Sequence, residues 1–183
     1  MRPAILALFL FASACDQTVT FTVTQSGETT VERGLELQCR LAALNIGRFS
    51  DISFEDTQEF ENQGVTKEDV KSAHLIDLKM RVKDPAGQDL SYLSRVAFHV
   101  ESPGQSKALV AEQDSFPDNV DTVTFRMTGT ELAPYVTAES MSITSEVTAN
   151  GCPDTDQTLE VTAVFEVEAT VQGLQKAARM ATP

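Results

Sequence analysis

The strongest constraint on the fold is a period of two in the placement of apolar residues along the second half of the chain. In residues 159–171, apolar side chains occupy every second position and alternate mainly with glutamates and threonines. These apolar residues are Leu159, Val161, Ala163, Phe165, Val167, Ala169 and Val171. Successive side chains of a β-strand point to opposite faces, so the pattern predicts a strand with one buried face and one solvated face.

The same alternation recurs earlier in the chain. One face of the stretch 74–82 is predicted to carry His74, Ile76, Leu78, Met80 and Val82. Shorter alternating stretches follow at 96–100, 123–127 and 141–147, and a short strand is expected around residues 108–111. Turn-forming residues separate them, as in Pro85–Gly87 and Asn150–Asp154. Half-buried strands favour antiparallel pairing. We therefore predict an all-β fold, an antiparallel two-sheet β-sandwich, with an immunoglobulin-like Greek key as the first arrangement and a jelly roll as the second.

The sequence of the N-terminal third fits more than one secondary structure. Residues 15–30 fit either the first strand, through Val19, Phe21 and Val23, or a threonine-rich tether. Residues 35–41 fit a strand or a helix equally well. One or two short helical turns are expected: residues 56–63 with Gly64 as C-cap, and a capping box over residues 66–69.

The length of 183 residues fits one domain. We assign residues 31–171 to the β-sandwich and residues 172–183 to a mobile polar tail. Residues 1–14 predict a signal peptide, because Arg2 precedes an apolar run over residues 4–12 that is too short to span a bilayer.

The segment Ala12-Ser13-Ala14-Cys15 resembles the lipobox of bacterial lipoproteins. The resemblance implies cleavage before Cys15 and lipid attachment, including acyl chains, to that cysteine. It departs from the family at Ala12, where leucine is usual, and Ala12-x-Ala14 also fits ordinary secretory cleavage. The resemblance thus implies a location in the bacterial cell envelope, on the inner or outer membrane, with the domain outside the cytoplasm.

The cysteine count agrees with this interpretation. Of three cysteines, lipidation would use Cys15 and leave the pair Cys39 and Cys152. Thiols outside the cytoplasm tend to be oxidised, so these two predict a disulfide, with two buried free thiols as the alternative.

The charge is strongly acidic, with 27 Asp and Glu against 14 Lys and Arg and a net charge of −13. Such a surface repels phosphate backbones, so we expect no nucleic-acid partner. The expected partners are the membrane, through the lipid on Cys15, and an envelope protein or glycan.

No catalytic motif occurs, so we expect no catalytic residues. We expect the His74 side chain to lie in the core or at its edge, and the His99 side chain to be solvated. We expect no cofactor, with calcium as a weak alternative in two oxygen-rich turns. The calcium candidates are Asp114, Asp118, Asp121, Asp154 and Asp156. We expect Leu132 and Tyr135 to pack in a corner of the fold. Tyr92 is expected to pack at the edge of a sheet.

Three phrases, QEFENQGVTKEDV, GQDLSYL and SMSITSEV, followed by a Pro-Asp turn and TLEV, resemble uncharacterised envelope proteins of Gram-negative bacteria over residues 50–170. The resemblance implies no activity. The sequence therefore favours a membrane-anchored, non-catalytic binding or structural module, and the alternative is a hydrolase that acts on envelope polymers through acidic residues.

Overall fold

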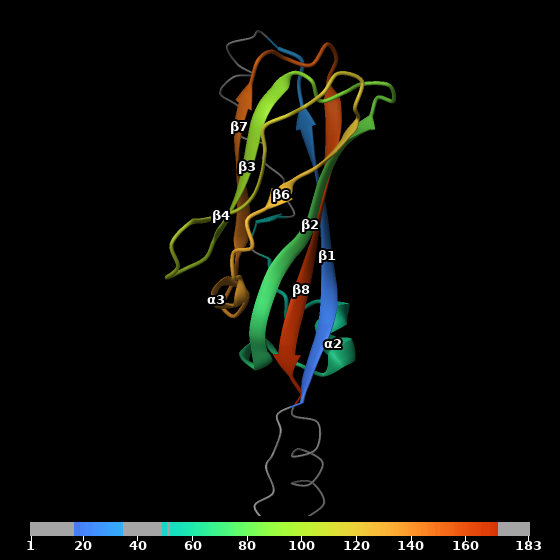
Figure 1. The fold of residues 1–183 in the computed structure, drawn as a ribbon. Helices are drawn as coiled ribbons and strands as arrows, with labels where there is room; N and C mark the ends of the chain where they lie inside the picture. Colours follow the sequence, from blue (N-terminus) through green and yellow to red (C-terminus); the bar gives the residue numbers. More distant parts are fainter. Residues whose placement is uncertain (1–16, 35–48, 51, 172–183) are drawn as a thin grey trace, which may run out of the picture.

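The computed structural model describes residues 17–34, 49–50 and 52–171 (Figure 1). The predicted signal peptide 1–14, Cys15, Cys39 and the tail 172–183 lie outside the described residues, as do residues 35–41. No helix among the described residues is long and apolar enough to cross a membrane.

Two antiparallel four-stranded sheets make up the domain. The first has the order β1-β8-β2-β5 and the second the order β6-β4-β3-β7. The strands of the first sheet are β1 (Thr18–Val31), β8 (Gln157–Thr170), β2 (Val70–Asp84) and β5 (Thr122–Thr124). Those of the second are β6 (Arg126–Met127), β4 (Ala108–Gln113), β3 (Leu93–Glu101) and β7 (Ser142–Ala149). The predicted antiparallel β-sandwich is confirmed.

The strand pairs are nested along the chain. β1 pairs with β8, Ile52 forms a bridge with Met141 just before β7, β2 pairs with β5, and β3 pairs with β4. A chain folded back on itself and then wrapped into two sheets gives this order, which is the jelly-roll arrangement. The second of the two predicted arrangements therefore describes the connectivity, because in an immunoglobulin-like sheet the first and last strands do not pair in this way.

Short helical elements lie in the connections between β1 and β2 and between β6 and β7. Helix α2 (Gln58–Gln63) ends at Gly64, whose φ of 63° is the left-handed conformation predicted for a C-cap. The 3-10 turn η2 (Lys67–Asp69) carries the predicted capping box between Thr66 and Asp69. A third element, α3 (Ala133–Val136), forms the corner before β7.

The predicted alternation is confirmed in β8 and β1. The inward side chains of β8 from Leu159 to Ala169 are fully buried, and the intervening ones are partly or fully exposed. Residues 18–31 are a strand rather than a tether, because β1 pairs with β8 continuously from Thr18↔Thr170 to Val31↔Gln157.

The prediction for the face of β2 is wrong in its first half. A register shift between Leu75 and Asp77 inserts one extra residue against β8, which is a β-bulge. As a result Leu75 is 5% exposed while Ile76 is 46% exposed, and the predicted order returns only from Leu78 onward. The bulge also places His74 on the outer face, where 40% of its side chain is exposed.

Aromatic rings cover the inner face of the first sheet near the start of β1. Phe60 of α2 meets Phe21 of β1 edge to face with a centroid distance of 5.2 Å, and Phe54 meets Phe165 in the same way at 5.2 Å. Phe54, Phe60 and Phe165 are buried. The short helix is therefore fixed by its apolar side, because six residues alone are too few for a stable helix.

Candidate functional site

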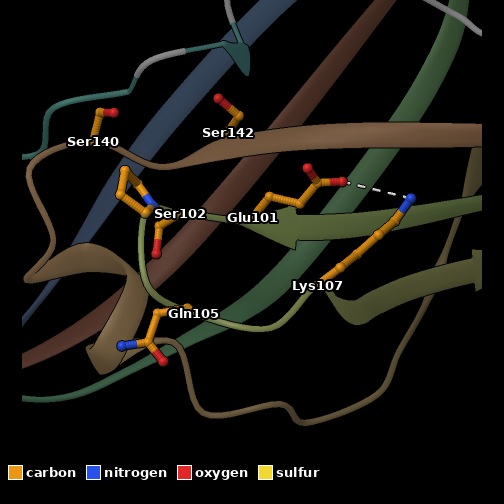
Figure 2. A pocket seen from close by; sticks show the side chains of 7 residues that line it. Glu101, Ser102, Gln105, Lys107, Ser140 and Ser142 are labelled. Atoms are coloured by element: carbon orange, nitrogen blue, oxygen red, sulfur yellow. Dashed lines mark ion pairs between the residues drawn. The ribbon is translucent and has the colours of Figure 1, made fainter.

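A hollow of about 310 Å³ lies where β3 ends and β7 begins (Figure 2). Its charged lining residues are Glu101, the last residue of β3, and Lys107, the residue before β4. The other lining residues are Ser102, Pro103, Gln105, Ser140 and Ser142. The register Glu101↔Ser142 brings the two segments together, although they are distant in the sequence.

The charges of the hollow are paired with one another. Lys107 Nζ donates a hydrogen bond to Glu146 Oε1 at 2.9 Å and lies 3.5 Å from Glu101 Oε1. Thr144 Oγ1 also donates to Glu101 Oε1, at 3.0 Å. The hydrogen bond from Lys107, with the nearby His99, holds the pKa of Glu146 below its usual range, and the same bond raises the pKa of Lys107.

A tight turn and two serines form the rest of the wall. Ser102 to Gln105 is a tight turn closed by a backbone hydrogen bond of 3.1 Å, with Gly104 at a positive φ of 80°. The Ser102 hydroxyl is buried and has no hydrogen-bond partner within the described residues. Ser140 and Ser142 come from the opposite side, at the start of β7 (Figure 2).

Sequence reasoning predicted none of these lining residues as a site. Ser102, Pro103 and Gly104 are ordinary turn residues and give no signal of a site. Single serines and one glutamate separated by about 40 residues give no local signal, and only the strand register joins them.

His99 lies close to this hollow, and the prediction that it is solvated is wrong. Only 16% of its side chain is exposed, and Nδ1 lies 3.9 Å from Glu146 Oε1. His99 does lie on the outer face of β3 as the alternation requires, but the side chains of the flanking strands β4 and β7 cover it, since β3 is an inner strand of its sheet.

His74 belongs to a second polar cluster, centred on Glu131. Glu131 accepts hydrogen bonds from the backbone N–H of Ala73 and of Ala133, both at 2.8 Å, and from Ser72 Oγ at 2.8 Å. His74 Nε2 lies 3.5 Å from the same carboxylate. Burial by itself would raise the pKa of Glu131, but the three hydrogen bonds outweigh it and lower the pKa.

Acid should therefore weaken the folded state through Glu131. Since its native pKa lies below the ordinary value of 4.5, the unfolded chain binds this proton more readily. The stabilisation is complete at neutral pH and is lost as the pH falls through that native pKa. In Glu131→Ala, we expect the free energy of unfolding at pH 7 to fall by about 1–2 kcal/mol, because two backbone donors lose their acceptor. Urea unfolding at pH 7 and at pH 3.5 measures both effects. A variant with unchanged stability and unchanged pH dependence would contradict this role.

The five calcium candidates lie in the segments 114–121 and 150–156, at the end of the sandwich opposite Thr18 (Figure 1). Asp156 accepts a hydrogen bond from the backbone N–H of Arg33, and Asp121 accepts one from the Thr122 hydroxyl. Among residues 17–34, 49–50 and 52–171, no three His, Cys, Asp or Glu side chains meet in a group that could hold a metal ion. Within the described residues, the structure thus does not bring three of these aspartates together.

The two tyrosines have packing roles. Leu132 is 1% exposed and Tyr135 is 8% exposed, and the Tyr135 hydroxyl donates to the carbonyl of Ser106 at 2.6 Å, as expected for a packed corner. Tyr92 is half-buried beside Asp89, and burial, followed by the carboxylate charge, raises its pKa.

Cys152 is disulfide-bonded. Its partner lies outside the described residues, so pairing with Cys39 stays a prediction. Peptide mapping of the unreduced protein should yield one fragment that joins the two cysteines.

No family model matches the chain, and no curated protein matches it. Among solved structures, the chain is similar to a chain in the cryo-EM structure of the semi-empty virus-like particle of the giant freshwater prawn Macrobrachium rosenbergii nodavirus. The identity is 11%, the TM-score is 0.33, and the alignment covers 86% of this chain and 97% of that chain. A likeness at this level carries no argument about function.

Proposed function

We propose that the protein is a lipoprotein of the bacterial cell envelope, anchored through lipid on Cys15, and that its domain is a non-catalytic binding module. The signal-peptide pattern of residues 1–14 and the lipobox-like residues 12–15 support the address and the anchor. The hollow beside β3 is the observation that supports binding, because several elements contribute polar side chains to this recess.

The position of β1 fits an anchor at one end of the sandwich. Thr18 begins β1 only three residues after Cys15 and pairs with Thr170. The intervening chain can reach about 10 Å. β1 has 14 residues and is therefore about 45 Å long, so the segment 150–156 at its far end would project that distance from the anchored end (Figure 1).

The carboxylates favour binding over hydrolysis. Four carboxylates of the described residues have displaced pKa values, and all four are lowered: Asp89, Glu112, Glu131 and Glu146. A glycosidase needs one carboxylic acid that stays protonated near neutral pH, which requires a raised pKa. At the hollow, Glu101 and Glu146 instead share the single Lys107 ammonium, at 3.5 Å and 2.9 Å.

Incubation of the purified mature protein with peptidoglycan tests the choice between module and hydrolase. We expect no release of soluble fragments above a boiled control. Fragment release that disappears in both Glu101→Gln and Glu146→Gln would contradict the proposal and support the envelope-polymer hydrolase.

A further inference from the structure

The turn that follows β7 carries an asparagine whose side chain has no hydrogen-bond partner among the described residues. Asn150 comes directly after the last residue of β7 and is exposed. Its backbone N–H donates to the Tyr92 carbonyl at 2.8 Å, and two residues later Cys152 is disulfide-bonded. Between these two fixed points, neither the Asn150 side-chain amide nor the Gly151 N–H forms a hydrogen bond with another described residue. The side-chain carbonyl carbon and the next backbone nitrogen are therefore available to each other.

Gly151 gives this part of the backbone freedom to rotate. A glycine reaches more combinations of φ and ψ than any other residue. No described atom lies within 4 Å of the position that a Cβ on Gly151 would occupy, so the space beside its backbone is open. Rotation can bring the Gly151 nitrogen to Asn150 Cγ, because closure between these two atoms makes a five-membered ring. Asn150–Gly151 is the one Asn-Gly pair of the sequence.

The other two asparagines of the described residues lack this combination. Asn62 lies in α2, and its Oδ1 accepts a hydrogen bond from Gln58 Nε2 at 3.2 Å. Asn119 is exposed, but Val120 follows it, and a β-branched side chain restricts the backbone and shields its nitrogen. The protein thus contains one pair suited to ring closure and two internal references.

We propose that Asn150–Gly151 is a site of spontaneous deamidation in the folded protein. Hydroxide removes the proton from the Gly151 nitrogen, which attacks Asn150 Cγ. The N–Cγ bond forms, the Cγ–Nδ2 bond breaks, and Nδ2 takes a proton from water and leaves as ammonia. The product is a succinimide, which water opens at either carbonyl.

The two ways of opening give two products. Opening at Cγ leaves an aspartate at position 150, and opening at the backbone carbonyl leaves an isoaspartate, in which the main chain runs through the former side chain. Each product adds one negative charge at the end of the sandwich opposite Thr18 (Figure 1). The isoaspartate also lengthens the main chain between β7 and Cys152 by one carbon. Because the reaction needs only water, the inference is independent of the lipid anchor and of any ligand.

Incubation of the full mature protein at mildly alkaline pH, followed by mass spectrometry, tests this. Cleavage after glutamate yields residues 147–160 with Asn150 and residues 113–131 with Asn119, so one digest contains the site and a reference. We expect aspartate and isoaspartate to accumulate at position 150, with Asn119 unchanged. Because no hydrogen bond holds the pair, the folded protein should react within about threefold of the rate of a synthetic peptide of residues 147–160. An unincubated sample sets the starting level.

Gly151→Ala is the matched variant, because the φ of Gly151 is not positive and the added Cβ meets open space. The variant should melt at the temperature of the unaltered protein and deamidate about tenfold more slowly, since alanine restricts the backbone rotation that closes the ring. An intact Asn150 in the folded protein, while the free peptide reacts, would overturn the inference. Equal rates at Asn150 and Asn119, or an unchanged rate in a folded Gly151→Ala, would do the same.

Discussion

Replacement of Cys15 by alanine should move the protein, expressed in a Gram-negative host, from the detergent phase to the aqueous phase after cloud-point partitioning. Each buried methylene contributes about 0.8 kcal/mol to membrane binding, so several acyl chains hold the protein firmly while their loss leaves an acidic domain. Because the net charge of −13 repels anionic headgroups, no electrostatic attraction should replace the lipid. We expect nearly complete transfer, measured by immunoblot of the two phases.

Cys39→Ala provides the matched control, because it removes a cysteine without touching the anchor. This variant should remain in the detergent phase even if the protein becomes less stable. Equal partitioning of the unaltered protein and of Cys15→Ala into the aqueous phase would contradict lipid attachment.

Leu75→Ala and Ile76→Ala should differ greatly in stability although the residues are isomeric neighbours. Leu75 is 5% exposed in the core and Ile76 is 46% exposed on the outer face. Truncation of a buried leucine costs about 2–5 kcal/mol through lost transfer energy and the cavity left behind, whereas a half-exposed residue costs less than about 1 kcal/mol. For a domain of this size, Leu75→Ala should lower Tm by roughly 4–20 °C.

Thermal unfolding of both variants and of the unaltered protein measures this difference. If strict alternation held through residues 74–82, Ile76 would be the buried residue. A larger loss of stability in Ile76→Ala than in Leu75→Ala would therefore show that the β-bulge is misplaced.

The bulge illustrates what the period of two could and could not predict. Alternation predicted the strands because it follows from the geometry of each strand alone, as in residues 159–169. A bulge is set by the register against a partner strand, here β8, and the sequence of β2 by itself carries no mark of the extra residue. The side chains directly before the bulge, His74 and Leu75, therefore lie on the faces opposite to those that strict alternation predicts.

The strand order was open for a similar reason. An immunoglobulin-like sandwich and a jelly roll require the same alternation in each strand, so the pattern does not distinguish them. Only the pairing of β1 with β8 and of Ile52 with Met141 decides the connectivity. Local signals did better: Gly64 as a C-cap and the capping box of Thr66 and Asp69 depend on nearby residues, and both were predicted.

The hollow could not be predicted because its parts have no individual signature. Ser102 is in a turn and Ser140 precedes a strand, and both are common places for serine. The aspartates in segments 114–121 and 150–156 were predicted as calcium candidates because they cluster in the sequence. In three dimensions, however, Asp121 accepts a hydrogen bond from the neighbouring Thr122 hydroxyl, and Asp156 accepts one from the distant Arg33 backbone N–H.

The most direct test of the account is the intact mass of the mature protein purified from membranes, with sequencing of its N-terminal peptide. The lipid-anchored module predicts a chain that begins at Cys15 and carries a diacylglyceryl group on the thiol and an acyl chain on the new amino terminus. A mature chain with a free, unmodified Cys15, or one that still carries residues 1–14, would contradict it.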